Sequence, residues 1–420
     1  MSFKFDAVQF EDYVGHLMSQ TKAPGVAVGL AVNGSLEYFK GFGLSDVEKK
    51  QPVRESTVFG LGSVTKSFTA LAINKLVEEN KLSLLDPVRC YLPEFRLKQE
   101  GSENKMTIHN FLSHSTGIPP LPSINLQKEI SNTAGEDRRA IRTNQELLNF
   151  MSEHDFDLLD VPGKHMSYSN DCFSLLGEVV QRVSGVTFEQ FVENHIWQPL
   201  GMERTFIDIN RLGEFEVQGL YQREKNGGLL KTPWLYREAY SSSGAMKSCV
   251  TDLLKYMELY MNRGVATGKT ICQSATVDRM TIPYYPIESR AYYGYGLEID
   301  PFYSQGATLV HHGGNTAGVS SQIGFVREKK IAVAVLTNLS DFPASKVFFS
   351  AINLALGLPL DHNKETKPIL DIPSEHLKKL AGDYVSGEGS LIMLRFDGEG
   401  IVAVAETADG EKNTFNLFPT

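Results

Sequence analysis

The sequence has few cysteines, no long apolar segment and no excess of positive charge. Four cysteines in 420 residues, without a Cys-x-x-Cys pair, are too few for a disulfide scaffold and do not have zinc-binding spacing. The longest nearly apolar stretch, 347–360, contains Ser350 and Asn353. It is too short to span a bilayer and predicts a core helix. Because 41 Lys and Arg stand against 50 Asp and Glu, a net charge of −9, we expect no nucleic acid or anionic membrane as a partner.

The N-terminus also lacks a basic segment followed by an apolar one, so no secretory signal is visible. We therefore expect a cytoplasmic protein with reduced, mostly buried thiols. The alternative is an exported protein whose signal segment is absent from this sequence. A composition of 42% hydrophobic and 22% charged residues is ordinary for a globular protein and excludes disorder, collagen and a coiled coil.

Strands are predicted near both ends of the first 360 residues, around a helical middle. Segments 26–32 and 35–42 flank the turn Asn33-Gly34, a strong hairpin signal. Segments 308–312, 319–326 and 331–336 follow much later, the last two joined by a polar turn. Tight turns join antiparallel strands. We therefore predict an α+β fold, in which one antiparallel sheet is completed by both ends of the domain, flanked by helices and joined to a helical subdomain.

The chain is predicted to divide into a domain over 1–360, a linker over 361–375 and a small C-terminal β meander over 376–420. The linker is polar and contains Pro368 and Pro373. The meander has four short strands, at 384–386, 391–396, 401–405 and 414–418, which bury little alone and leave edge groups unpaired. We expect it to pack on the catalytic domain or on a second subunit, and we favour a homo-oligomer.

Ser63-Val-Thr-Lys66 is the sharpest chemical signal. Residues three apart share one face at a helix start, so Lys66 can lie beside the Ser63 hydroxyl and help to remove its proton. The helix N-terminus adds N–H groups and positive potential near a developing oxyanion. The pairs Ser19/Lys22 and Ser102/Lys105 have the same spacing. Only Ser63 follows a Gly-rich turn and opens an amphipathic helix, predicted over 63–79; the alternative role for Ser63 is a plain helix cap.

Two further motifs carry suitable groups. Tyr168-Ser-Asn170 lies in a loop before a helix, where a phenolate beside a lysine can act as a base and an amide can bind substrate. His312-Gly-Gly314 ends a predicted strand, and its glycines let a substrate backbone approach. The alternative role for Tyr168 is that of a half-buried aromatic residue in a loop. The alternative for His311 and His312 is that they are surface or core histidines, and they form no metal-binding pattern.

Other nucleophile schemes are weaker. The sequence has no Gly-x-Ser-x-Gly elbow and no phosphate-binding P-loop motif. His114-Ser115 suggests a Ser–His pair, but the pattern favours the end of a short helix over 108–112 followed by a turn at Gly117. Tyr260-Met-Asn262 repeats the Tyr-x-Asn spacing at the polar end of another predicted helix.

Together, the three motifs in this order resemble the serine β-lactamase-like and penicillin-binding protein family. The similar branch holds class C β-lactamases, D-alanyl-D-alanine carboxypeptidases, D-aminopeptidases and esterases. Further matches are 59–68, 112–119 and 312–318, and the resemblance spans roughly residues 20 to 345. It implies a β-lactamase/transpeptidase-like fold, and the C-terminal meander resembles the lipocalin-like extension of some of these peptidases.

The resemblance also implies roles for individual residues. Ser63 would be the acylated nucleophile, and Lys66 and Tyr168 would share the general base and acid work. The N–H groups of Ser63 and Asn315 would form the oxyanion hole. The residues expected to position substrate are Asn170, His312, Gly313 and Gly314. The family needs no metal and no organic cofactor.

One departure narrows the expected function. His312 stands where many β-lactamases carry a lysine that attracts the antibiotic carboxylate, which disfavours efficient β-lactam hydrolysis. We therefore expect a serine peptidase that forms an acyl-enzyme on a small peptide or amide, of carboxypeptidase or aminopeptidase type, acting on D-amino acids. A carboxylesterase or β-lactamase of the same fold is the alternative within the class. A non-catalytic penicillin-binding or sensor protein is the alternative of another class.

Overall fold

The computed structural model describes residues 4–98, 101–121, 123, 141–224, 227–288, 291–304, 306–362, 372–385, 391–398, 400–406 and 412–417. Its main feature is an antiparallel sheet, which has nine strands within these residues, in the order β10-β11-β12-β13-β14-β15-β1-β2-β3. The strands are β1 Gly25–Val32, β2 Ser35–Asp46, β3 Gln51–Pro52, β10 Tyr285–Glu288, β11 Ala291–Tyr293, β12 Glu298–Ser304, β13 Ala307–Thr316, β14 Val319–Val326 and β15 Ile331–Thr337.

The sheet joins the two ends of the domain, as predicted. Strand β1 lies between β2 and β15, with Val28 opposite Val335. The predicted strand and hairpin segments in this region all occur, some with longer bounds. The sequence pattern missed β10 to β12, and it also missed the hairpin of β5 (Leu220–Arg223) and β6 (Leu229–Thr232) in the middle of the chain.

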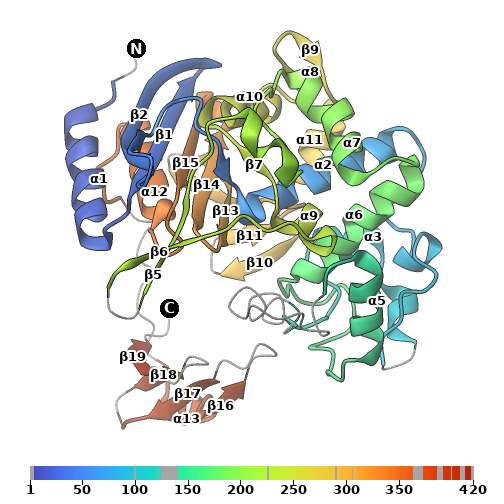
Figure 1. Ribbon diagram of the computed structural model, residues 1–420. Helices are drawn as coiled ribbons and strands as arrows, with labels where there is room; N and C mark the ends of the chain where they lie inside the picture. The colour runs from blue at the N-terminus through green and yellow to red at the C-terminus, as the bar shows by residue number, and fades with distance from the viewer. Residues whose placement is uncertain are drawn as a thin grey trace.

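Helices cover both faces of the sheet (Figure 1). The described helices are α1 Ala7–Thr21, α2 Thr65–Glu78, α3 Ile108–Leu112, α5 Asn144–Glu153, α6 Asn170–Ser184, α7 Phe188–Val192, α8 Gln198–Leu200, α9 Ser241–Gly244, α10 Val250–Met261, α11 Ser274–Met280, α12 Ala344–Ala355 and α13 Ser374–Lys378. The alternation of side chains along β1 explains the two layers. Val28 packs in a buried cluster with Phe10 of α1 and Phe348 of α12, whereas Ala27 packs in the cluster that contains α2, α6 and α10.

Three short strand pairs complete the described body: β4 (Phe59–Gly60) with β7 (Lys247–Ser248), β5 with β6, and β8 (Val265–Ala266) with β9 (Lys269–Thr270). The β4–β7 pair matters most for the site. It anchors the chain just before Ser63, and the Leu61 N–H donates to the Met246 carbonyl.

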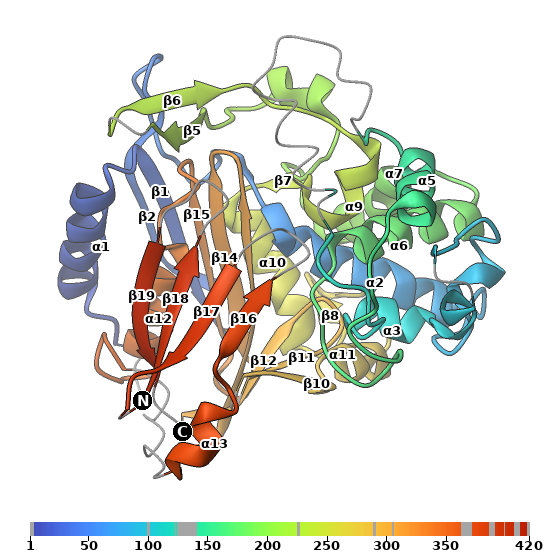
Figure 2. The ribbon, with the colours of Figure 1, turned by 90° about the horizontal axis from the view of Figure 1, so that it is seen from below.

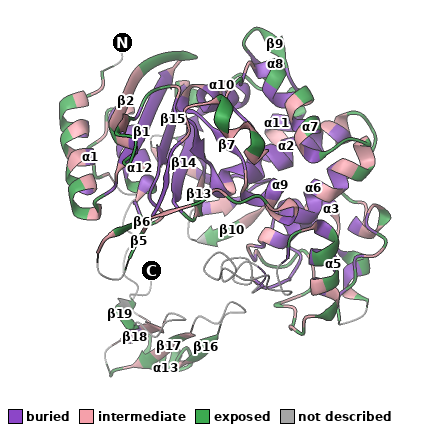
Figure 3. Ribbon diagram, viewed as in Figure 1, coloured by how far each residue is buried: buried purple, intermediate pink, exposed green. Residues whose placement is uncertain are grey.

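The C-terminal strands form a separate four-stranded sheet (Figures 1 and 2). They are β16 Gly382–Val385, β17 Leu391–Phe396, β18 Ile401–Glu406 and β19 Lys412–Leu417. Most of this sheet is exposed or half-buried, in contrast to the main sheet (Figure 3). Most of the predicted linker over 361–375 falls outside the described residues, so the proposed division at 1–360 and 376–420 stays a prediction.

Candidate active site

Ser63 and Lys66 lie at the junction of a short 3-10 turn and a helix. The turn η1 spans Gly62–Val64, and α2 begins at Thr65, so the helix predicted over 63–79 starts as a 3-10 turn. Lys66 is completely buried in the first turn of α2. Its Nζ lies 3.0 Å from the Ser63 Oγ, which places an amine directly beside the candidate nucleophile.

The surroundings of Lys66 favour a neutral amine. Its Nζ also donates to the Asn170 Oδ1 at 2.7 Å and to the Ser243 carbonyl at 2.8 Å. Burial holds the pKa of Lys66 well below its usual 10.5, and the nearby Asp171 carboxylate opposes this shift only in part. A neutral amine has two protons for the two carbonyl acceptors, so its lone pair remains for the Ser63 proton. This arrangement fits a general base.

Tyr168 lies over the same lysine, just before α6. The Lys66 Nζ is 4.9 Å from the centre of the Tyr168 ring. Burial raises the pKa of the Tyr168 phenol, and the neighbouring Ser63 hydroxyl opposes this shift. The resting side chain is therefore a neutral phenol rather than the phenolate that the sequence analysis considered. The phenol thus keeps a proton that it can donate, and the neutral Lys66 amine beside it is the better candidate for the base.

His114 packs against Tyr168. The two rings lie with centroids 4.2 Å apart, and the His114 Nδ1 accepts the Ser169 N–H at 3.1 Å. Burial holds the pKa of His114 well below 6.5, so its ring is uncharged. Ser115 bonds instead to Asn110 and Ser113. His114-Ser115 is therefore not a catalytic pair, as the sequence indicated, although His114 itself positions the tyrosine.

The third motif brings strand β13 against η1. A Cβ atom added to Gly314 would lie 2.0 Å from the Leu61 carbonyl oxygen and 2.9 Å from the Ser63 N, and one added to Gly62 would lie 2.7 Å from the Asn315 N. Only glycine permits so close an approach. The backbone N–H groups of Ser63 and Asn315 thus lie near each other, as an oxyanion hole requires.

Strand β13 also offers an open edge at this point. Its pairing with β12 runs through His311, which lies opposite Glu298, the first residue of β12. From His312 onward, β12 contributes no partner on that side. An extended substrate can therefore lie along β13 next to Ser63, as peptides do when they add to a sheet edge.

His312 is buried and fully bonded. Its Nδ1 lies 2.6 Å from the Gly313 carbonyl oxygen, and its Nε2 lies 3.0 Å from the Tyr293 hydroxyl. A carbonyl only accepts, so Nδ1 carries the proton and Nε2 accepts from Tyr293. Burial lowers the pKa of His312 to about 4, although the Glu298 charge opposes this shift. The ring is neutral and has no N–H left for a substrate anion.

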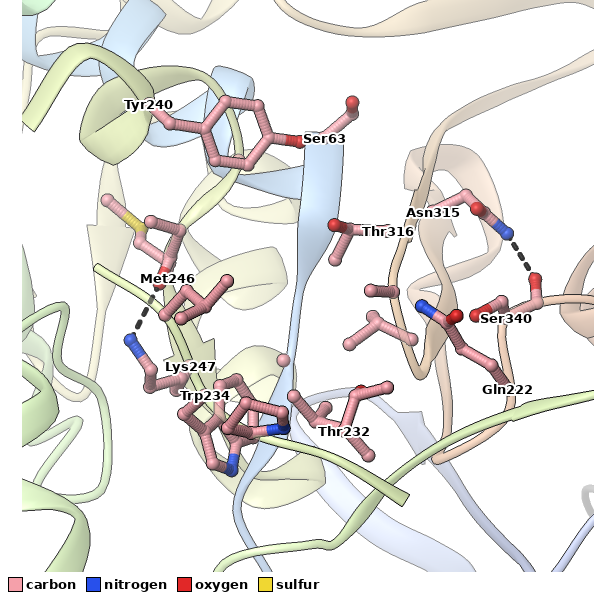
Figure 4. A pocket seen from close by; sticks show the side chains of 18 of the residues that line it. Ser63, Gln222, Thr232, Trp234, Tyr240, Met246, Lys247, Asn315, Thr316 and Ser340 are labelled. Carbon is pink, nitrogen blue, oxygen red and sulfur yellow. Dashed lines mark hydrogen bonds between the residues drawn. The ribbon is translucent and has the colours of Figure 1, made fainter. Parts of the chain in front are cut away.

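Two cavities meet at Ser63. The larger, about 610 Å³, extends past Asn170 and Tyr240 to Trp234 on the segment after β6 (Figure 4). There Asn315 donates through its side chain to the Ser340 carbonyl. The smaller, about 400 Å³, includes Tyr168 and His312. The site can thus hold one part of a substrate on each side of a bond at Ser63.

All eight candidate residues therefore lie in or beside this one site, and the alternative motifs do not. Ser19 lies within α1, where its hydroxyl donates to the Gly15 carbonyl. Ser102 and Lys105 belong to a 3-10 turn, η3 (Ser102–Lys105), and Tyr260 bonds to Tyr256 inside α10.

The sequence analysis missed several residues that complete the site: Tyr240, the Ser243 carbonyl, Glu298 and Gln322. Ser243 is followed by Gly244, and this pair is the one short sequence signal among them, since the others lie in segments without a recognisable pattern. Among the described residues, no group of three or more metal-ligating side chains occurs. No helix in the described part of the chain is long and apolar enough to cross a membrane.

Comparisons with known proteins agree with this geometry. The Beta-lactamase family model matches residues 10–350. Protein flp of Staphylococcus aureus (strain MW2) is 27% identical over 338 residues, and Beta-lactamase of Escherichia coli (strain K12) is 26% identical over 351 residues. The alignments cover 79% and 77% of this chain, and 63% and 86% of those proteins. The chain thus spans less than two thirds of the length of the staphylococcal protein.

Solved structures show the same fold. The octameric penicillin-binding protein homologue from Pyrococcus abyssi superposes with a TM-score of 0.78 at 32% identity, over 98% of this chain and 90% of that chain. A class C beta-lactamase superposes with a TM-score of 0.68 at 21% identity, over 85% of this chain and 97% of that chain. The first of these similarities includes the C-terminal sheet region, because it covers nearly the whole chain.

Proposed function

The chain belongs to the beta-lactamase family of serine hydrolases, and we propose that it hydrolyses peptide or amide bonds through an acyl-enzyme on Ser63. The observation that carries this proposal is the buried Lys66 amine, 3.0 Å from the Ser63 Oγ and held by two carbonyl acceptors. A merely structural serine at a helix start needs no such neighbour. Burial of an amine is costly, and enzymes use it to lower the pKa of a base.

The proposed reaction begins with proton transfer from Ser63 to Lys66. The Ser63 Oγ then forms a bond with the substrate carbonyl carbon, and the resulting oxyanion accepts the N–H groups of Ser63 and Asn315. Lys66 becomes an ammonium, and its positive charge beside Tyr168 lowers the energy of the phenolate that forms when Tyr168 gives up its proton.

Tyr168 donates that proton to the leaving nitrogen as the carbon–nitrogen bond breaks, and it recovers a proton from Lys66. Water then attacks the ester carbonyl carbon and gives one proton to the same pair. The pair passes that proton to the Ser63 Oγ as the ester carbon–oxygen bond breaks, which releases a carboxylic acid and restores the Ser63 hydroxyl. Asn170, which lines the larger cavity, holds the acyl part of the substrate. No metal or cofactor takes part.

The neutral His312 supports a preference for peptides or amides over β-lactams. A β-lactam antibiotic presents a carboxylate, and His312 has neither a charge nor a free N–H to receive it. The preference for D-amino acids rests on the resemblance of the motifs and the C-terminal sheet to peptidases of that type. A carboxylesterase remains the second candidate, because the same acyl-enzyme forms more readily from an ester.

A fluorophosphonate label combined with a substrate screen tests this proposal. The intact protein should gain one label on the peptide that contains Ser63, and Ser63→Ala should remain unlabelled. In a screen of D- and L-aminoacyl amides, p-nitrophenyl esters and nitrocefin, an amide or ester should show the highest kcat/KM, with continued turnover after any burst. Labelling that survives Ser63→Ala contradicts the nucleophile. A burst without turnover identifies a non-catalytic binding protein.

A further inference from the structure

The smaller cavity at Ser63 has a charge distribution that neither the motifs nor the family model specifies. Its charged residue, among the described residues that line it, is Glu298. The carboxylate side chain is one third exposed. The catalytic groups nearby do not compensate the charge of the Glu298 carboxylate, because Lys66, Tyr168 and His312 are all neutral for the reasons given above.

Glu298 has no cationic partner within the described chain. No lysine or arginine there forms an ion pair with it, and its nearest basic atom is the His311 Nδ1 at 3.8 Å, beyond hydrogen-bond distance. That nitrogen is already used, since it lies 3.0 Å from the Gln322 Nε2, while the His311 Nε2 lies 3.2 Å from Asp300. The Gln322 amide only donates through nitrogen, so the His311 Nδ1 is an acceptor and has no proton for Glu298.

The same chain of hydrogen bonds orients Gln322. Because its Nε2 donates to His311, its carbonyl Oε1 is left as an acceptor. That oxygen is on the side of β13, where a Cβ added to Gly313 would lie 2.6 Å from it. Gln322 lines the cavity together with Glu298. The cavity therefore presents a carboxylate and an amide oxygen, and the His312 ring, which also lines it, offers no donor.

The position of Tyr168 shows which part of a substrate this cavity receives. Tyr168 gives its proton to the leaving group, and it lines the same cavity as Glu298, whereas Asn170 lines the larger cavity on the other side of Ser63. We infer that the smaller cavity binds a leaving group that carries a positive charge, with the Glu298 carboxylate and the Gln322 carbonyl oxygen as its acceptors. This inference rests on the proposed function. It names the substrate class as amides or esters with a cationic leaving group. It excludes substrates whose leaving group ends in a free carboxylate.

Three esters of N-acetyl-D-alanine with the same acyl group test this inference. The leaving groups are choline, its uncharged isostere dimethylbutanol and the anionic sulfoethanol. Each kcat/KM is divided by the rate of hydroxide hydrolysis, which removes differences in intrinsic reactivity. The wild-type protein should prefer the choline ester over the uncharged one by about fivefold, the upper range for a partly exposed ion pair, and should hydrolyse the anionic ester slowest.

Two variants and one control separate the charge from other effects. Glu298→Gln should abolish the preference for choline, and Glu298→Lys should reverse it in favour of the sulfoethyl ester. A variant that fails to fold cannot produce such a reversal. Glu203 is an exposed carboxylate that lines neither cavity, so Glu203→Gln should keep the wild-type order.

The outcomes distinguish the two proposals. If fluorophosphonate labels Ser63 of the wild-type protein but Glu298→Gln and Glu298→Lys keep the wild-type order of esters, the role of Glu298 is overturned and the hydrolase proposal stands. If the wild-type protein is neither labelled nor active on any ester, both are overturned.

Discussion

The close approach of β13 to η1 gives the most quantitative prediction. Gly314→Ala adds one methyl group at a point where its carbon would lie 2.0 Å from the Leu61 carbonyl oxygen and 2.7 Å from the Ser321 Oγ. Real Cβ contacts essentially never fall below 3.0 Å, so the two backbones must separate by about 1 Å (3.0 − 2.0). That displacement moves the Asn315 N–H away from the Ser63 N–H and widens the oxyanion hole.

The expected loss is large and selective for catalysis. A misplacement of about 1 Å in a reacting group costs about 10²-fold in rate, and the loss of one oxyanion donor costs about 10²- to 10³-fold. We therefore expect Gly314→Ala to lower kcat and the rate of fluorophosphonate labelling by at least about 10²-fold. Overpacking should destabilise the fold by only about 1–3 kcal/mol, which a thermal melt measures separately.

Gly15→Ala is the matched control. Gly15 lies inside α1 and has no atom within 4 Å of an added Cβ, so alanine there should leave the rate unchanged and stabilise the helix by about 0.5–1 kcal/mol. A Gly314→Ala protein with activity within about threefold of the wild type would refute the close approach and, with it, the proposed oxyanion hole.

Three further predictions concern the base, the absence of a metal and the assembly. Lys66→Ala and Tyr168→Phe should each lower kcat by orders of magnitude, and the double variant should be little worse than the worse single one, because the two residues form one proton path; additive losses would argue for separate roles. EDTA should leave kcat/KM unchanged, and a loss that zinc restores would require a metal in the site. The C-terminal sheet exposes apolar side chains such as Val385 and Phe415. Light scattering should therefore find an oligomer that loses mass when residues 362–420 are removed, whereas a monomeric full-length chain at micromolar concentration would exclude pairing between subunits.

Local patterns predicted the frame of this fold. The hairpin turn at Asn33-Gly34 and the strands on both sides of it occur, because they depend on neighbours in the sequence. The β5–β6 hairpin was not predicted, since its strands Leu220–Arg223 and Leu229–Thr232 are short and do not alternate between apolar and polar residues. Their pairing depends on tertiary contacts rather than on periodicity.

Local sequence patterns likewise predicted some residues of the candidate site and not others. Ser63, Lys66 and Tyr168 could be found because they belong to short motifs with a recognisable spacing. The neutral state of His312 could not be predicted, because it depends on Tyr293 and on complete burial. Glu298 was also missed, since one carboxylate at a strand start has no signature until β12 places it opposite His311.

The pH dependence of Ser63 acylation tests the central claim, a neutral Lys66 acting as the base, most directly. The rate of labelling by a fluorophosphonate should rise with pH as Lys66 loses its proton, because only the neutral amine accepts the serine proton. Since burial lowers the pKa of Lys66, the rise should end well below pH 10.5. It should be followed by a plateau up to at least pH 10, because burial raises the pKa of Tyr168 above 10.0.

Lys66→Arg supplies the reference for this profile, because an arginine keeps its charge at every accessible pH and should remove the rising limb. The account predicts a wild-type rate that is already pH-independent at mildly alkaline pH. A rate that keeps rising through pH 10.5, as an ordinary solvated lysine requires, would contradict it.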